Sequence, residues 1–140
     1  MPFKIPSTAM VLAAGLGKRM QPLTGTTPKP MLLLNDKPLI GHVMDRLVHT
    51  GVTRAVVNLH YLGEQIRDYL KSEKRLEIIF SEEVELLETG GGVKHAMTEL
   101  GTEPFYVVNS DAFWLDGYED TLVRLAREWI DADMDAILLL

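Results

Sequence analysis

The sequence contains no cysteine, and this absence excludes several kinds of site. Without thiols the chain can form no disulfide, no thiolate zinc site and no cysteine nucleophile. Aromatic residues make up only 7% of the chain, and no apolar run approaches the length of a membrane span. Basic residues are outnumbered, since 14 Lys and Arg face 20 Asp and Glu, giving a formal net charge of −6. A nucleic-acid partner usually requires a basic surface and is therefore not expected.

What is present fits one globular domain over residues 1–140. The chain is 46% hydrophobic and 24% charged, which is typical of a soluble protein with a core of its own. The segment Met1–Pro6 has no apolar signal core, so we expect a cytoplasmic protein. Ala136–Leu140 has the composition of a buried strand. Because a domain rarely stops inside such a strand, we expect the chain to be the N-terminal part of a longer protein.

Short apolar runs alternate with amphipathic segments along the chain. This alternation favours right-handed βαβ units and an α/β fold, a three-layer Rossmann-like sandwich with a mainly parallel sheet. In such sheets ligands bind at the carboxyl ends of the strands, near the point where the strand order reverses. If the order is 3-2-1-4-5, the end of the first strand and the end of the fourth are neighbours on either side of that point. The predicted strands are Thr8–Ala14, Arg54–Leu59, Leu76–Phe80, Phe105–Asn109 and Ala136–Leu140, and the predicted helices are Leu39–Thr50, Gly63–Lys71, Gly90–Leu100 and Glu119–Ile130.

A glycine-rich loop with two cations follows the first predicted strand. Its sequence is Gly15-Leu-Gly-Lys-Arg19. Bare backbone N–H groups and positive charge at a strand end suit a polyphosphate. The loop lacks the Gly-Lys-Ser/Thr ending of a Walker A motif, and Met20 stands where a dinucleotide fingerprint has its third glycine. A phosphate site and a plain turn between strand and helix both account for the two glycines.

A lysine between two prolines strengthens the phosphate interpretation. Because a residue before proline is biased away from the helical region, we expect Thr27 and Lys29 to be extended. Pro28 has a restricted φ as well, so Lys29 is held on a stiff backbone. Such a cation is pre-positioned for an anion. The alternative is a solvated lysine in a proline-rich turn.

Two further clusters carry possible ligand contacts. Leu87-Glu-Thr-Gly-Gly-Gly92 opens a predicted helix, where free N–H groups and small residues allow a flat ligand to approach. A flexible turn with Thr89 as N-cap is the alternative. Asn109-Ser-Asp111 ends the fourth strand, and Asp111 beside a phosphate would suit Mg²⁺, although an Asx turn also fits. The carboxylates of the loop before the glycines are interpreted as solvated: Glu82, Glu83, Glu85 and Glu88.

Taken together, these motifs resemble the signature of the sugar-1-phosphate nucleotidyltransferases. The resemblance begins with Leu12-Ala-Ala-Gly-Leu-Gly-Lys-Arg-Met-Gln-Pro-Leu-Thr24 and Pro28-Lys-Pro30. It continues through Lys37-Pro-Leu-Ile, Gly51-Val-Thr, Asn58-Leu-His-Tyr-Leu-Gly-Glu-Gln-Ile, Glu88-Thr-Gly-Gly-Gly and Asn109-Ser-Asp, and so covers roughly Met10 to Asp111. Within the family, the sequence is most similar to the branch that acts on N-acetylmuramate 1-phosphate and UTP in peptidoglycan recycling. The mannose-1-phosphate guanylyltransferase branch, which uses GTP, remains open.

The resemblance implies a reaction and a role for each matching residue. A sugar 1-phosphate would attack the α-phosphorus of a nucleoside triphosphate, and pyrophosphate would leave. Arg19 would neutralise the β- and γ-phosphates, Lys29 would contact the α-phosphate or the attacking phosphate, and Asp111 would hold the Mg²⁺ cofactor. The nucleotide would lie against a set of small residues, with the second group lining base and ribose: Ala14, Gly15 and Gly17, and Thr89, Gly90 and Gly91.

The sequence also departs from the family pattern. Members carry a second metal-binding aspartate and most sugar contacts in a later segment, and Asp116, Glu119 and Asp120 do not match it. These three are interpreted as loop and helix-start residues. We therefore expect little transferase activity from residues 1–140 alone. A nucleotide-sensing module without catalysis and, less well matched, an NAD-dependent dehydrogenase are the alternatives. The sequence does not indicate an oligomeric state.

Overall fold

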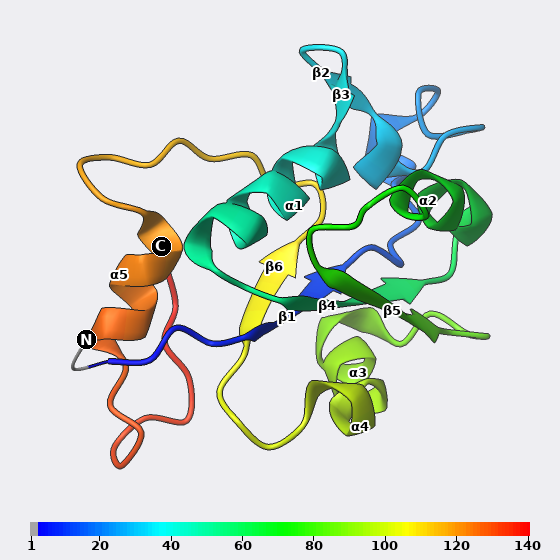
Figure 1. Cartoon of the computed structure of the whole chain (residues 1–140). Coiled ribbons are helices and arrows are strands. Elements are labelled where there is room, and N and C mark those ends of the chain that lie inside the picture. The colour runs from blue at the N-terminus through cyan, green and yellow to red at the C-terminus, as the bar shows by residue number, and fades with distance from the viewer. Residues whose placement is uncertain (1–2) are drawn as a thin grey trace.

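A four-stranded parallel sheet forms the centre of the computed structural model, which describes residues 3–140 (Figure 1). The strand order is β5-β4-β1-β6, so the chain builds the sheet outward from β1 on one side and then crosses to the other. Met10 of β1 is paired with Val56 of β4 and with Val107 of β6. The order agrees with the first four positions of the 3-2-1-4-5 arrangement considered from the sequence. The strands are β1 (Thr8–Leu12), β4 (Arg54–Leu59), β5 (Glu77–Glu82) and β6 (Tyr106–Asn109).

Helices cover both faces of this sheet, as the continuous apolar strands require. On one face lie α1 (Leu39–Thr50) and α2 (Gly63–Leu70), and on the other lie α3 (Glu88–His95) and α4 (Met97–Leu100) (Figure 1). Successive residues of β1 point to opposite faces. Val11 thus joins the larger core cluster with Leu47 of α1, whereas Met10 packs with Ala96 and Leu100 in the smaller one. The predicted three-layer α/β architecture is confirmed.

The predicted fifth strand is wrong. Residues 136–140 form no strand, and Leu138 and Leu139 are 78% and 57% exposed. The run has the composition of a buried strand, but a strand also needs a neighbour to complete its ladder of hydrogen bonds. In the described part of the chain, β6 pairs with β1 alone. The preceding helix is α5 (Thr121–Glu128), where Asp120 caps the N-terminus by accepting hydrogen bonds from the N–H groups of Leu122 and Val123.

Three local features differ from the sequence-based expectation. The helix expected to follow the triple glycine begins before it at Glu88, takes the three glycines into its first turns, and is interrupted at Ala96. Lys29 does not continue an extended segment but opens a 3-10 turn, η2 (Lys29–Met31), and another 3-10 turn is η1 (Lys18–Met20). A small hairpin, β2 (Leu33–Leu34) with β3 (Lys37–Pro38), had no predicted counterpart. Its turn residues Asn35 and Asp36 both have positive φ, as the favoured two-residue hairpin turn requires.

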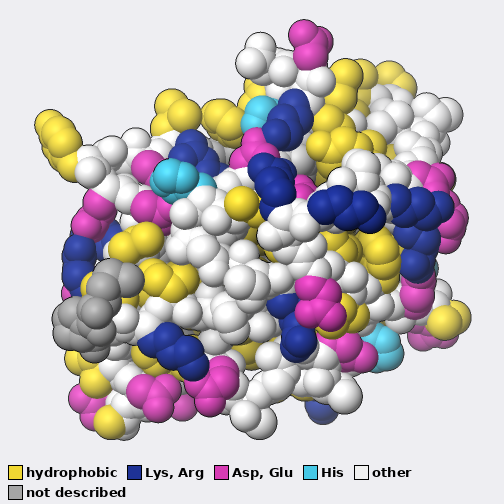
Figure 2. All heavy atoms as spheres, in the orientation of Figure 1, with side chains coloured by type: hydrophobic (Ala, Val, Ile, Leu, Met, Phe, Trp, Pro, Cys, Tyr) yellow, Lys and Arg dark blue, Asp and Glu magenta, His cyan; other side chains and the backbone are white. Residues whose placement is uncertain are grey.

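Basic and acidic side chains are interspersed on the face seen in Figure 2. Several are paired there or elsewhere on the surface, for example Arg75 with both Asp45 and Glu73. Over residues 3–140, the structure contains no helix of the length and apolar character needed to cross a bilayer.

Candidate active site

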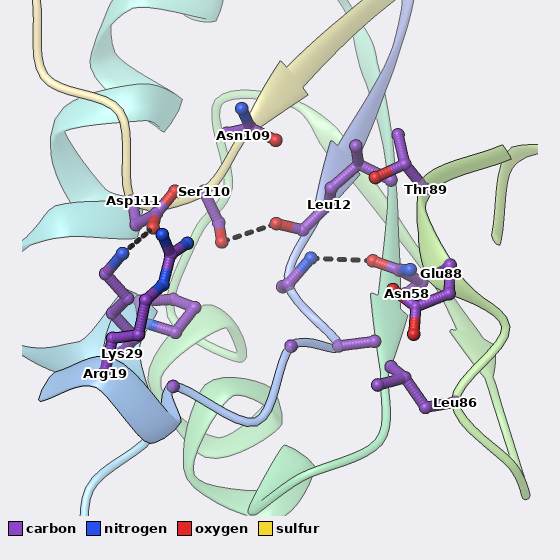
Figure 3. Close-up of a pocket in the computed structure, with 15 residues that line it drawn as sticks. Leu12, Arg19, Lys29, Asn58, Leu86, Glu88, Thr89, Asn109, Ser110 and Asp111 are labelled. Carbon is purple, nitrogen blue, oxygen red and sulfur yellow. Dashed lines mark hydrogen bonds and ion pairs between the residues drawn. The ribbon is translucent and has the colours of Figure 1, made fainter. Parts of the chain in front are cut away.

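A pocket of about 340 Å³ opens at the carboxyl ends of β1, β4 and β6 (Figure 3). This is the place where the strand order reverses, because β4 and β6 flank β1 on opposite sides. Several segments meet there: the end of β1 with the loop and 3-10 turns that follow it, the end of β4, the residues at the start of α3, and the end of β6 with the turn after it. The lining residues are Leu12, Ala13, Ala14, Gly15, Gly17, Arg19, Lys29, Pro30, Asn58, Leu86, Glu88, Thr89, Asn109, Ser110 and Asp111.

The loop after β1 is anchored from both neighbouring strands. On the β4 side, the N–H of Ala13 donates to Oδ1 of Asn58 over 2.7 Å. On the β6 side, Oγ of Ser110 donates to the carbonyl oxygen of Leu12 over 2.6 Å, and the N–H of Ser110 donates to the same oxygen. The first residues of the glycine loop therefore have a fixed path where they border the pocket.

Farther along, the loop folds over a buried threonine. Thr24 is fully buried, and its hydroxyl donates to the carbonyl oxygen of Gly17 over 2.6 Å. Gly17 has a φ of +62°, and a Cβ there would lie 2.9 Å from Cγ2 of Thr24. From the loop after β4, the hydroxyl of Tyr61 donates to the carbonyl oxygen of Thr24, and the side-chain amide of Gln65 donates to that of Thr26. These contacts hold the segment that carries Arg19.

The two predicted cations border the same pocket (Figure 3). Arg19 is exposed on η1, and no ion pair involving it occurs among residues 3–140. Lys29 lies between two buried prolines, Pro28 and Pro30, at the start of η2. Proline is tolerated in the first turn of a helix, where its missing N–H has no partner to lose. Lys29 is therefore mounted on a short rigid turn, although not on the extended backbone that the sequence predicted.

Lys29 and Asp111 form an ion pair across the mouth of the pocket, with 2.6 Å between Nζ and Oδ2. About a third of each side chain is exposed, 33% and 30% respectively. A pair of this kind adds little to stability because solvent screens both charges. It does place a cation and a carboxylate within reach of one bound group.

The oxygen ligands in the pocket suit a metal ion that is shared with a phosphate. No cluster of three acidic or histidine side chains suited to a metal occurs in residues 3–140. Asp111 offers a carboxylate and Asn109 an amide oxygen, and both residues line the pocket. Mg²⁺ is commonly bound through one or two carboxylates, with water and substrate phosphates completing its shell. The residues present therefore fit Mg²⁺ brought in with a nucleotide better than a metal held by protein alone.

The structure gathers most of the predicted site residues and leaves two aside. The seven that line the pocket are Ala14, Gly15, Gly17, Arg19, Lys29, Thr89 and Asp111. Gly90 and Gly91 lie on α3 and do not line it, so their contact with base and ribose remains a prediction. The third glycine, Gly92, has tertiary neighbours instead. A Cβ at Gly92 would lie 2.8 Å from Nδ2 of Asn58 and 3.0 Å from Oε2 of Glu83.

Two buried polar residues beside the pocket were missed. Asn58 is only 3% exposed, and the sequence did carry a signal for it, because it is the one polar residue in the apolar run Ala55-Val-Val-Asn-Leu59. Glu83 is 5% exposed, so its interpretation as a solvated carboxylate is wrong. It accepts hydrogen bonds from Nδ2 of Asn58 and from the N–H of Leu87. The bond between Asn58 and Glu83 joins residues 25 apart in the sequence, and such a contact has no local sequence pattern.

Similarity to known proteins shows the family of this chain. The family model described as "Nucleotidyl transferase" matches residues 8–137. The chain belongs to the nucleotidyl transferase family. It is 41% identical over 140 residues to the N-acetylmuramate alpha-1-phosphate uridylyltransferase of Caulobacter vibrioides, a match that covers 96% of this chain and 58% of that protein. It is 40% identical over 108 residues to the mannose-1-phosphate guanylyltransferase catalytic subunit beta of Drosophila melanogaster, covering 74% of this chain and 29% of that protein.

The family's fold is matched as well. A crystal structure of UDP-glucose pyrophosphorylase complexed with UDP-glucose superposes with a TM-score of 0.77 at 24% identity, covering 86% of this chain and 52% of that one. The chain spans 58% of the uridylyltransferase relative, so it corresponds to a little over half of such a nucleotidyltransferase. The resemblance that the motifs indicated is thus confirmed at the level of family and fold.

Proposed function

We propose that this chain binds a nucleoside triphosphate with Mg²⁺ and forms the nucleotide-binding part of a sugar-1-phosphate nucleotidyltransferase. The observation that carries the proposal is the meeting of Arg19, Lys29 and Asp111 with the glycine loop in one pocket. A module that only senses a nucleotide has no need of two cations and a carboxylate that all face the phosphates of one nucleotide. UTP and N-acetylmuramate 1-phosphate are the preferred substrates, which would place the enzyme in cell-wall recycling in the cytoplasm.

In the proposed reaction, a phosphate oxygen of the sugar 1-phosphate attacks the α-phosphorus of the triphosphate. One P–O bond forms there, the bond from the α-phosphorus to the bridging oxygen breaks, and pyrophosphate leaves with the electron pair. No covalent bond to the protein is needed. The protein contributes alignment of the two phosphates and neutralisation of their charge.

Each side chain has a distinct task in this scheme. Lys29 leaves its ion pair with Asp111 and donates to the α-phosphate or the attacking phosphate. Arg19 donates to the β- and γ-phosphates and to the departing pyrophosphate. Asp111 and Asn109, both on the pocket wall, would offer oxygens to Mg²⁺, which would supply further neutralisation of the phosphate oxygens. Ala14, Gly15 and Thr89 line the walls against which the nucleoside packs.

The choice of UTP rests on the relatives. The match to the uridylyltransferase covers 96% of this chain, against 74% for the guanylyltransferase, at similar identity. GTP with mannose 1-phosphate is the second candidate because that relative still retains 40% identity over 108 residues.

A thermal-shift panel tests the proposal. The purified chain is heated with UTP, GTP, CTP, ATP or NAD, each with and without Mg²⁺. Nucleotide at 100 times its Kd should raise the free energy of unfolding by about 2.7 kcal/mol. We expect a Mg²⁺-dependent shift with UTP. A shift with GTP alone would select the guanylyltransferase candidate, and no shift with any triphosphate would refute the nucleotide site.

Paired substitutions test the cations. Arg19→Ala should weaken triphosphate binding, whereas Lys18→Ala should not, because Lys18 is adjacent in the chain but does not line the pocket. Lys29→Ala should lower turnover severely in an enzyme that contains the whole domain, with the fold intact. Near-normal pyrophosphate release by that variant would remove Lys29 from the proposed mechanism.

A further inference from the structure

A buried amide on the pocket wall lies side by side with a buried carboxylate that does not line the pocket. Asn58 comes from the end of β4 and Glu83 from the residue after β5, and they are 3% and 5% exposed. Nδ2 of Asn58 donates to Oε2 of Glu83 over 2.7 Å. Burying polar groups is unfavourable unless each is hydrogen-bonded. The other hydrogen-bond partners of Asn58 and Glu83 therefore indicate what the pair does in the structure.

Those partners are the two loops that wall the pocket. Oδ1 of Asn58 accepts from the N–H of Ala13, where the chain leaves β1 for the glycine loop. Oε1 of Glu83 accepts from the N–H of Leu87, the residue just before α3. Three hydrogen bonds thus run in series from one loop to the other, through two side chains that solvent hardly reaches.

The backbone on either side fixes this series in place. The N–H of Glu83 donates to the carbonyl oxygen of Leu59, and the carbonyl oxygen of Glu83 is hydrogen-bonded to Nδ1 of His60. From above, Gly92 of α3 packs so closely that even a Cβ would collide with both side chains of the pair. The direction of the amide is fixed too, because its oxygen faces an N–H and its nitrogen faces a carboxylate.

We propose that Asn58 and Glu83 are positioning residues that set the separation between the glycine loop and the loop at 86–89, and thereby the width of the slot for the nucleoside. The inference rests on the proposed nucleotide site. Directional hydrogen bonds define one spacing, whereas apolar contacts of the same volume would tolerate several. The two side chains act through Ala13 and Leu87, while Arg19 and Lys29 at the other end of the pocket hold phosphate independently.

Exchanging the amide at position 58 and the carboxylate at position 83 tests this proposal directly. Asn58→Asp sets a carboxylate against Glu83. Glu83→Gln makes an amide N–H₂ face either the N–H₂ of Asn58 or the N–H of Leu87, so one donor meets another donor. In the double variant N58D/E83Q, the carboxylate now at position 58 accepts from Ala13 and from the new amide at position 83, and the oxygen of that amide accepts from Leu87. All three hydrogen bonds return with the same number of heavy atoms and the same net charge.

The readout is the affinity of each variant for Mg²⁺·UTP and for inorganic pyrophosphate, measured by calorimetry. Each single variant should bind UTP about tenfold more weakly, equivalent to about 1.4 kcal/mol, and the double variant should recover most of that loss. Pyrophosphate affinity should stay unchanged in all three. Tyr106→Phe is the matched control, since it removes a buried hydrogen bond to Leu122 outside the pocket and should leave both affinities unaltered.

The outcomes separate the two proposals. If the unsubstituted chain binds no triphosphate, the proposed function fails and this inference falls with it. If the chain binds UTP and the single variants bind it equally well, only the inference is overturned. A double variant no better than its parents overturns it as well. Should N58D fail to fold, the comparison of E83Q with the double variant decides the matter in the same way.

Discussion

An added methyl group should affect different properties at two glycines of the same loop, the stability of the fold at Gly17 and nucleotide binding at Gly15. At Gly17 the backbone is left-handed, with a φ of +62°, and a Cβ would lie 2.9 Å from Cγ2 of the fully buried Thr24. At Gly15 no heavy atom lies within 4 Å of the added Cβ, and φ is not in the left-handed region. Gly17→Ala is therefore expected to affect the fold, and Gly15→Ala the pocket.

The magnitudes follow from these two environments. A left-handed conformation costs a residue with a Cβ about 1–2 kcal/mol, and overpacking adds about 1–3 kcal/mol. Gly17→Ala should thus lower the free energy of unfolding by about 2–5 kcal/mol. Gly15→Ala meets no clash and restricts the unfolded chain, so the free energy of unfolding should change by less than about 1 kcal/mol. Its methyl group stands on the pocket wall and should weaken nucleotide binding.

Urea unfolding and UTP titration of both variants provide the assay. Thr24→Ser in the Gly17→Ala background removes the Cγ2 atom that clashes, so it should recover the overpacking part of the loss but not the part due to φ. A Gly17→Ala chain as stable as the parent would refute the close contact between the loop and Thr24. A Gly15→Ala chain with unaltered UTP affinity would show that the nucleotide does not pack against Gly15.

Three further predictions concern other parts of the molecule. Burial, and then the charge of Asp120, raises the pKa of Tyr106 to about 12 from 10.0, so the fold favours the neutral phenol. Up to about 3 kcal/mol of stability that is present below pH 10 should therefore be lost between pH 10 and 12 relative to Tyr106→Phe, as measured by urea unfolding. Asp120→Ala removes the N-cap of α5 and should lower the free energy of unfolding by about 1 kcal/mol in the same assay, whereas Asp120→Asn should retain most of it. In the described residues, Asp111 is the only carboxylate paired with Lys29, and one carboxylate so paired should not hold Mg²⁺ without a phosphate. Millimolar Mg²⁺ without nucleotide should therefore leave the melting temperature unchanged. A clear shift that Asp111→Asn abolishes would reveal a metal site that needs no phosphate.

The sequence predicted the parts of the fold that depend on local pattern. Arg54–Leu59 and Leu39–Thr50 have the predicted bounds because each combines a clear apolar period with an end signal, such as Gly51 after α1. The strand order 3-2-1-4-5, considered from the sequence as one arrangement, holds for its first four positions and brings Asp111 to the same pocket as the glycine loop. The prediction of a strand at Ala136–Leu140 was wrong because composition describes the environment that a strand needs and does not provide the neighbouring strand.

The glycines show why the site was harder to predict than the fold. Reasoning from the chain alone treats every glycine near a phosphate loop as a surface for the ligand. In the structure, Gly17 is required by the side chain of Thr24, and Gly92 by the Asn58–Glu83 pair, so both serve contacts within the protein. Gly15, with open space beside it on the pocket wall, is the one of these three whose smallness no protein atom explains. A glycine that lines a pocket and whose missing side chain is explained by no protein neighbour is the one to assign to a ligand. This criterion needs tertiary coordinates, because both the pocket and the neighbours come from distant segments.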